Sequence, residues 1–138
     1  MAKRRATTWI VACALMLGGL TALTARQEAP AATPAAKLKN PVPSTGESIA
    51  AGQATFMMRC QACHQPDLHG GTSFGLETPA IVPSLTDDEW LHGGTDGEIF
   101  DVIKNGVPPN FDMQAWAEQI EDKEIWNLVN FIRSRHGP

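Results

Sequence analysis

Cys60-Gln61-Ala62-Cys63-His64 is the stretch that decides most about the fold of this 138-residue chain. Two cysteines separated by two residues and followed directly by histidine form the attachment signature of c-type haem. Two thiols about one helical turn apart can each add to one haem vinyl group, and the next residue then offers an imidazole nitrogen to the iron. We therefore expect one covalently bound haem c per chain, attached at Cys60 and Cys63 and ligated by His64.

Two other uses of this motif are open. A thiol–disulfide pair is one, but redox motifs of this kind normally lie beside a βαβ pattern, and no alternating or β-branched run flanks Cys60 and Cys63. A zinc site is the other. Structural zinc needs a second Cys or His pair at similar spacing, and the remaining histidines, His69, His92 and His136, provide none. The motif therefore favours covalent haem.

Charge is unevenly distributed along the chain, which has room for one domain. The whole sequence carries a formal net charge of −4, whereas residues 40 to 138 contain five basic and fourteen acidic side chains. An acidic domain repels the phosphate backbone, which argues against nucleic acid as a partner. The charge favours docking on a redox partner protein that is basic near its own redox centre.

The N-terminus has the pattern of an export signal. Three basic residues at positions 3 to 5 precede an uncharged stretch at 6–25 with small residues near its end. About 20 uncharged residues would also just span a bilayer. Residues 1–25 are thus expected to be a cleaved signal peptide or a transmembrane anchor, with lipidation at Cys13 as a weaker alternative. We expect the rest of the chain on the periplasmic side of a bacterial inner membrane.

Residues 26–43 are rich in alanine and proline and contain almost nothing to bury. Such a composition is typical of an extended, semi-rigid linker, although a disordered tail left after processing is equally compatible. At about 3.1 Å per residue, the segment would hold the domain up to roughly 50 Å from the membrane. The haem domain is then expected over residues 44–138.

Helix starts recur beyond the linker. Three segments fit the capping box, in which a hydroxyl and a later glutamate satisfy each other's open backbone donors. They predict a helix that runs to Cys60, a short helix around Trp90, and a helix that stops at Asn105-Gly106. The three patterns are Ser44-Thr45-Gly46-Glu47, Thr86-Asp87-Asp88-Glu89 and Thr95-Asp96-Gly97-Glu98.

The clearest helical period lies near the C-terminus. Apolar residues recur there at i, i+3, i+4 and i+7, namely Ile125, Leu128, Val129 and Ile132. They predict a helix that begins near Glu121 and is ended by Gly137-Pro138. The loops at 65–85 and 106–120 are rich in glycine and proline, and no segment alternates like a strand. The expected fold class is all-α, with about four short helices.

The residue on the other face of the haem decides between electron transfer and chemistry at the iron. The candidates are Met57, Met58, His69, His92 and Met113. The first three lie within a few residues of the haem motif and belong to its side of the cofactor. Met113 lies about fifty residues later, in a loop where the chain can fold over the opposite face. A core role for Met113 and replacement ligation by His92 are the alternatives.

From Gly46 onward, the chain resembles the class I c-type cytochromes. Gly52, Phe56 and the haem motif stand at the spacing of that family, and Gly52 and Phe56 match its close contact with Leu128 and Phe131 of the last helix. The resemblance implies the cytochrome c fold, in which an N-terminal helix that ends in the haem motif packs against a C-terminal helix.

The same resemblance implies further site residues. Pro83-Ser84-Leu85 is similar to the family's Pro-x-Leu, whose proline carbonyl orients the axial imidazole, and Met113 falls where the family has its methionine ligand. Trp90 would line the haem pocket, although packing alone explains it as well. The run from Leu85 to Gly94 is similar to the haem domains of the cbb-type oxidase's cytochrome subunit. That subunit normally has two haem motifs and this chain has one.

With both axial positions filled, by His64 and Met113, no coordination site remains for oxygen or peroxide. We therefore expect a single-electron carrier rather than an enzyme, passing electrons between a respiratory or dehydrogenase complex and an acceptor. One alternative is a haem-bearing subunit of a membrane oxidase or dehydrogenase complex. Another is a haem enzyme or gas sensor with an open sixth position. Residues 6–25 would supply any membrane tether.

Overall fold

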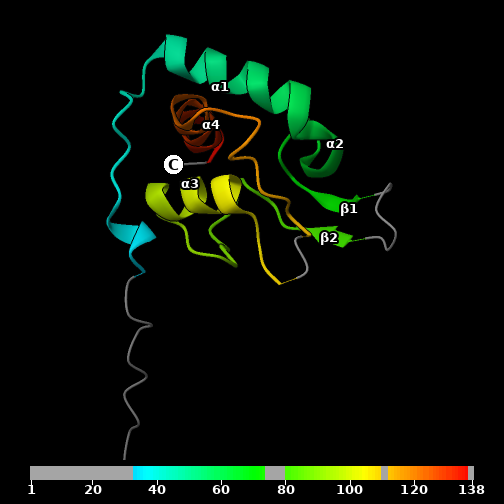
Figure 1. Cartoon of the computed structure of the whole chain (residues 1–138). Coiled ribbons are helices and arrows are strands. Elements are labelled where there is room, and N and C mark those ends of the chain that lie inside the picture. Colours follow the sequence, from blue (N-terminus) through cyan, green and yellow to red (C-terminus); the bar gives the residue numbers. More distant parts are fainter. Residues whose placement is uncertain (1–32, 74–79, 110–111, 137–138) are drawn as a thin grey trace, which may run out of the picture. The chain divides into compact units, whose positions relative to one another are not determined.

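The computed structural model describes residues 33–73, 80–109 and 112–136, and the predicted signal or anchor at 1–25 lies outside them (Figure 1). The elements, in chain order, are η1 (Ala35–Lys37), α1 (Gly46–Arg59), α2 (Gln61–His64), β1 (Gly71–Ser73), β2 (Ala80–Val82), α3 (Asp96–Asn105) and α4 (Asp122–Arg135). Within the described ranges, no helix is long and apolar enough to cross a membrane.

The pairing of α1 with α4 is the main helix contact of the domain (Figure 1). Gly52 is the point of closest approach. A Cβ atom added there would stand 2.5 Å from the carbonyl carbon of Asn127 and 2.9 Å from the Cβ of Phe131. The Phe56 and Phe131 rings also touch, with centroids 5.3 Å apart. The predicted contact of Gly52 and Phe56 with the last helix is confirmed, because only a residue without a side chain lets the two backbones come so close.

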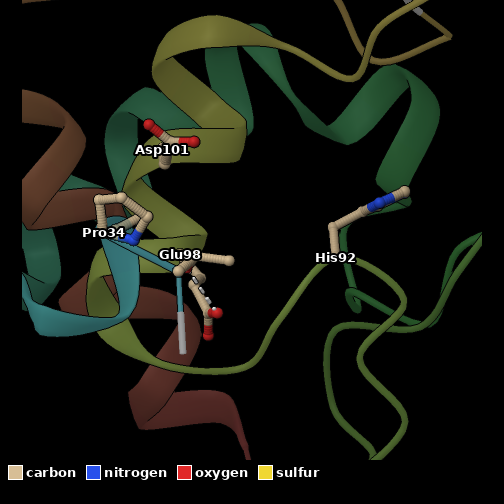
Figure 2. Close-up of a pocket in the computed structure, with 6 residues that line it drawn as sticks. Pro34, His92, Glu98 and Asp101 are labelled. Carbon is tan, nitrogen blue, oxygen red and sulfur yellow. Dashed lines mark hydrogen bonds between the residues drawn. The ribbon is translucent and has the colours of Figure 1, made fainter. Parts of the chain in front are cut away.

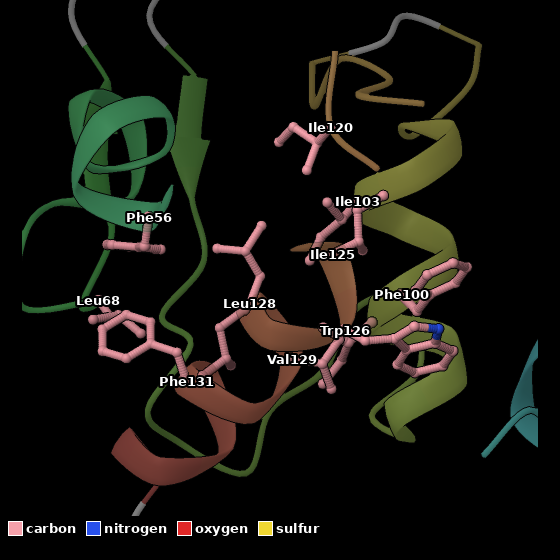
Figure 3. Close-up of a cluster of buried hydrophobic side chains, with 12 residues drawn as sticks. Phe56, Leu68, Phe100, Ile103, Ile120, Ile125, Trp126, Leu128, Val129 and Phe131 are labelled. Carbon is pink, nitrogen blue, oxygen red and sulfur yellow. The ribbon is translucent and has the colours of Figure 1, made fainter. Parts of the chain in front are cut away.

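The buried core lies along α4 and is covered by α1 and α3 (Figure 3). At one end it contains Phe56, Leu68 and Phe131, and at the other end the ring of Phe100 stacks on that of Trp126 with centroids 4.1 Å apart. The predicted helical period of α4 is confirmed, because all four of its periodic residues are buried. The buried side chains of α4 therefore connect the end of α1 that carries the haem motif to α3.

The helix starts are largely those that the capping patterns predict. Thr95 and Glu98 form the expected capping box, and α3 ends at Asn105 with Gly106 at a φ of 71°. Glu121 caps α4. The start of α1 differs by one residue, because the side chain of Thr45 rather than Ser44 accepts the hydrogen bond from the backbone of Ser48. Two adjacent hydroxyls compete for one cap, and the sequence pattern does not rank them.

The short helix predicted around Trp90 is wrong. Residues 85–94 form bends and turns instead. The side chain of Asp87 accepts from the backbone N–H of Glu89 at 3.0 Å, which closes a local turn in place of a helical hydrogen bond. Gly93 then follows at a φ of 89°. These local bonds and the glycine pair at 93–94 explain why a good capping pattern does not start a helix here.

A two-stranded ribbon is the one departure from a purely helical domain within the described residues. Strands β1 and β2 are antiparallel, with Gly71 opposite Val82 and Thr72 opposite Ile81. Each strand has only three residues, which is too short for an alternating pattern to be read from the sequence. The all-α class nevertheless holds, because the helices provide the core.

The described part of the segment expected to be a linker, residues 33–43, lies against the domain. Gly97 of α3 is buried under Ala35 and Leu38, where an added Cβ would stand 2.7 Å from the Leu38 Cβ. The Asn40 amide donates to the backbone oxygen of Trp126 at 3.2 Å and to the side chain of Asn130 at 2.9 Å. Composition predicts an extended linker, but these few polar and backbone contacts fasten the segment to α3 and α4.

Candidate haem-binding site

The haem motif forms a tight turn at the end of α1. Cys60 closes α1 by donating its N–H to the carbonyl of Phe56 at 2.8 Å, and the chain re-enters a helix at once as α2. The backbone N–H groups of Cys63 and His64 both donate to the Cys60 carbonyl, at 3.1 and 3.0 Å. One carbonyl therefore fixes the spacing of the two thiols and the imidazole.

Both thiols of the motif are free and half-buried. Burial, assisted by the neighbouring Cys63, raises the pKa of Cys60 to about 11, although the Arg59 charge lowers it in part. Redox-active dithiols work in the opposite way, because their chemistry requires a depressed thiol pKa. Among the described residues, no three His, Cys, Asp or Glu side chains are grouped so that they could hold a metal ion by themselves. The geometry therefore supports neither the dithiol nor the zinc alternative.

His64 is a half-buried imidazole whose surroundings favour the neutral form. Desolvation by burial lowers its pKa, and its ring lies against Phe56 with centroids 6.4 Å apart. The ring nitrogen Nδ1 is buried and has no hydrogen-bond partner in the part of the chain that the structure describes. A neutral imidazole is the form that binds a metal, and a buried polar nitrogen without a protein partner is rare. His64 thus fits the role of an axial ligand.

The Pro83 carbonyl does not reach His64 in this structure, in contrast to the predicted orienting hydrogen bond. It lies against Gly70, where an added Cβ would stand 2.6 Å from the Pro83 oxygen. The segment from Pro83 to Leu85 is attached to the loop after the haem motif by a backbone hydrogen bond instead, because Leu85 donates its N–H to the carbonyl of Leu68 at 2.8 Å. Within that loop, Gly70 donates its N–H to the carbonyl of His64 at 3.1 Å. Leu85 itself is half-buried against the core.

Met113 differs in its surroundings from the other candidates for the second ligand. It is half-buried and packs against the core. Met57, Met58, His69 and His92 are all exposed, and Met58 retains 76% of its accessible surface. Of the five candidates that the sequence offers, Met113 alone combines partial burial with a place in the loop before α4.

His92 belongs to a hollow of about 290 Å³ (Figure 2). The hollow is also lined by Thr33, Pro34, Glu98 and Asp101, which come from the N-terminal segment and from α3. The hydroxyl of Thr33 donates to Glu98 at 3.0 Å across it. This open hollow, which contains two carboxylates beside His92, does not single out His92 as an iron ligand.

Trp90 is enclosed by the C-terminal end of α4. Its ring is stacked on that of His136 at 5.6 Å, and the guanidinium of Arg133 lies 5.5 Å from the ring centre on the Trp90 indole. Arg133 in turn donates to Asp96 at 2.7 Å. These contacts account for the half-buried position of Trp90 by packing, and its place beside the haem stays a prediction.

Two residues near the site make contacts that no local sequence pattern indicates. Leu68 is completely buried and has a φ of 67°, which places its backbone where Leu85 can bond to it. Gly106 was read only as a helix stop, yet it lies under the backbone of Met113. Both contacts join residues that are far apart in sequence, so no local pattern shows them.

Comparison with known proteins agrees with this geometry. A family model described as cytochrome c oxidase, cbb3-type, subunit III, matches residues 47–132. The chain belongs to this family. The matched range of the subunit III family runs from the first turn of α1, through the haem motif and the Met113 loop, almost to the end of α4.

The curated relatives are oxidase subunits that are longer than this chain. The chain is 31% identical over 91 residues to the cbb3-type cytochrome c oxidase subunit CcoP of Rubrivivax gelatinosus, covering 66% of this chain and 27% of that subunit. It is 39% identical over 97 residues to subunit CcoP of Rhodobacter capsulatus, covering 63% of this chain and 30% of that subunit. The chain thus spans less than a third of the length of these relatives.

Among solved structures, cytochrome cL of the marine methylotroph Methylophaga aminisulfidivorans is similar in fold. The TM-score is 0.56 at 25% identity, and the match covers 72% of this chain and 58% of that protein. The cytochrome c fold predicted from the sequence is confirmed. Haem c is the cofactor of this fold family, and the residues present fit it, since two half-buried thiols on one turn precede a half-buried imidazole whose Nδ1 has no hydrogen-bond partner among the described residues.

Proposed function

We propose that this protein is a single-electron carrier that holds one haem c through Cys60, Cys63 and His64, with Met113 as the second axial ligand. The observation that carries the proposal is the haem-motif turn, in which backbone hydrogen bonds to the Cys60 carbonyl hold the two cysteines beside a half-buried imidazole whose pKa is lowered by desolvation. Membership of a family of oxidase haem subunits supports it. When bound, haem c supplies a ferric/ferrous couple that exchanges one electron.

The chain's own residues would hold the haem and tune this couple in four ways. The two thiols hold the cofactor permanently, and Phe56 packs against the imidazole of His64 and limits its motion. The buried cluster beside the motif excludes water. A thioether ligand from Met113 favours the ferrous state relative to a harder ligand and so raises the reduction potential.

Carrier rather than enzyme is the role that this ligand set supports. A ligand on each face leaves no position at which oxygen or peroxide could bind. The partial burial of Met113, compared with the exposed alternatives, supports its assignment as the second ligand. An enzyme or gas sensor would instead need a sixth position that is open or easily vacated.

Redox proteins are the proposed partners, on the periplasmic side of a bacterial inner membrane. The acidic balance of residues 40–138 supports a partner with a basic surface and argues against nucleic acid. A second candidate is a haem-bearing electron-transfer subunit of a membrane oxidase or dehydrogenase complex, and it is favoured by the similarity to subunits of cbb3-type cytochrome c oxidases. Co-purification of other subunits at high salt would support this second candidate over a mobile carrier.

A membrane tether through residues 6–25 is part of the proposal. The basic positions before this stretch and its uncharged character support either a cleaved signal or a retained anchor. Washing membranes with alkaline carbonate distinguishes the two. Retention of the protein in the washed membranes supports an anchor, whereas its complete release supports cleavage or a soluble form.

Visible spectra of the holoprotein and of two methionine variants test the ligand set. We expect the wild type to show the charge-transfer band of thioether-ligated ferric haem. Met113→Ala should lose the band, and its reduced form should bind carbon monoxide. Met58→Ala is the matched control, because Met58 is exposed near the haem motif, and it should keep the band. A band that survives in Met113→Ala would refute the assignment of Met113.

A further inference from the structure

The loop that carries Met113 begins at the C-terminal end of α3 and returns to it. Gly106 ends α3 and donates its N–H to the carbonyl of Val102 at 2.9 Å. The next residue, Val107, donates its N–H to the carbonyl of Met113 at 2.9 Å. This bond closes the loop at its base and ties the Met113 backbone to the residue beside Gly106.

A second attachment lies on the other side of Met113. The N–H of Trp116 donates to the carbonyl of Ile103 at 3.1 Å, and that of Ala117 donates to the carbonyl of Lys104 at 3.0 Å. Both acceptors are among the last carbonyls of α3. The Met113 backbone is therefore fastened on each side to one helix end, and the described residues of its loop, 106–109 and 112–119, form no helix or strand.

The end of α3 is itself fixed to the rest of the domain. Ile103 is buried in the core, beside Ile120 and Ile125 (Figure 3). Lys104 donates to both carboxylate oxygens of Asp122, at 2.7 and 2.8 Å, which joins the end of α3 to the start of α4. A change at the junction between α3 and the loop must therefore be absorbed by the loop rather than by the helix.

Gly106 is the residue at that junction, and it is buried directly under the loop. A Cβ atom added to it would stand 2.6 Å from the Met113 carbonyl oxygen, 2.8 Å from the Ala115 nitrogen and 3.0 Å from the Gln114 carbonyl carbon. All three are backbone atoms of consecutive residues, so no side-chain rotation relieves the contact. Its φ of 71° and ψ of −172° also lie in a region that essentially glycine alone adopts.

We propose that Gly106 is a positioning residue for Met113. Its missing side chain sets how closely the loop lies on the end of α3 and thereby where the Met113 thioether is held. The inference rests on the proposed function, in which Met113 is the second ligand. It extends that function by naming the residue on which the ligand's placement depends, since the loop has no other close backbone contact of this kind among the described glycines.

The experiment compares holoproteins of the wild type, Gly106→Ala and Gly71→Ala. Gly71 is the matched control, because its φ of 113° also disfavours alanine while nothing lies within 4 Å of an added Cβ. Three quantities are measured: the thioether-to-iron charge-transfer band of the ferric protein, carbon monoxide binding by the reduced protein, and urea unfolding followed by the band and by helical circular dichroism.

We expect Gly106→Ala to lose the band and gain carbon monoxide binding while it keeps its helices. We expect Gly71→Ala to keep the band, to bind no carbon monoxide, and to lose the band and its helices in one coincident urea transition. If Gly106→Ala retains a weakened band, the band should disappear at lower urea than the helices. A normal band with coincident transitions would overturn the inference. So would a Gly106→Ala protein that fails to fold, because Gly106 would then serve the whole domain. A wild type without the band would overturn the proposed function itself.

Discussion

Gly52 of α1 lies against the backbone of Asn127 in α4, so that a Cβ atom added to Gly52 would stand 2.5 Å from the Asn127 carbonyl carbon. Two turns later α1 ends and the haem motif begins. The crossing of the two helices therefore sets the position of the thiols and the imidazole relative to the core. Gly52, which has no reactive side chain, therefore helps to position the haem-binding residues.

Gly52→Ala should lower the free energy of unfolding by about 1–3 kcal/mol, since an added methyl group in a tight contact forces the helices apart. Urea unfolding of the holoprotein measures this. Gly46→Ala is the control, because Gly46 lies in the first turn of the same helix with nothing within 4 Å of an added Cβ. Equal effects of the two substitutions would contradict the close crossing.

Asn130→Ala should destabilise the domain by about 1–3 kcal/mol, because it leaves buried polar groups without partners. The Asn130 amide donates to the Ser48 hydroxyl at 2.7 Å and to the Val42 carbonyl at 3.1 Å, and its oxygen accepts from Asn40. Thermal unfolding provides the measurement. Asn105→Ala, at an exposed amide that bonds only to Asp101 in the described structure, should change stability little.

The stability of the domain should fall in acid partly through Glu98. Hydrogen bonds from Thr95, first from its backbone and then from its hydroxyl, and a further one from Thr33 lower the pKa of the Glu98 carboxyl from 4.5. A lowered folded-state pKa means that the stabilisation is complete above 4.5 and is lost as pH falls through the folded-state value. Glu98→Gln should flatten the pH dependence of the melting temperature in that range. A pH dependence that Glu98→Gln leaves as steep as in the wild type would contradict this role of Glu98.

Phe56→Ala should cost about 3–5 kcal/mol of stability, because it opens a cavity where a large ring is lost from the core. Phe56 is 1% exposed and touches both His64 and Phe131. The substitution should also broaden the electron paramagnetic resonance signal of the ferric haem, since the axial imidazole loses its neighbour. Met58→Ala, on the exposed side of the same helix, should do neither.

Local patterns predicted the parts of the fold that depend on neighbouring residues. Thr95 and Glu98 form a capping box because both partners lie within one turn. The same pattern failed at Thr86, where Asp87 closes a competing turn and Gly93 follows with a positive φ. A capping pattern indicates where a helix can begin, but competing hydrogen bonds and glycines in the residues that follow determine whether the helix forms.

Contacts between distant residues could not be predicted from the sequence. Asn40 fastens an alanine- and proline-rich segment to α4, although nothing in its local composition distinguishes it from a residue of a linker. The haem motif was evident because its three functional residues are adjacent. The relation of Gly106 to Met113 was not, because it arises only when the loop folds back on α3.

A spectroscopic redox titration of the purified holoprotein distinguishes an electron carrier from a ligand-binding haem protein. We expect one covalently bound haem, low-spin spectra in both oxidation states, a single one-electron transition, and no carbon monoxide binding by the reduced wild type. A high-spin spectrum together with ready carbon monoxide binding would contradict the account, because it would show an open coordination position and therefore a role in ligand chemistry rather than electron transfer.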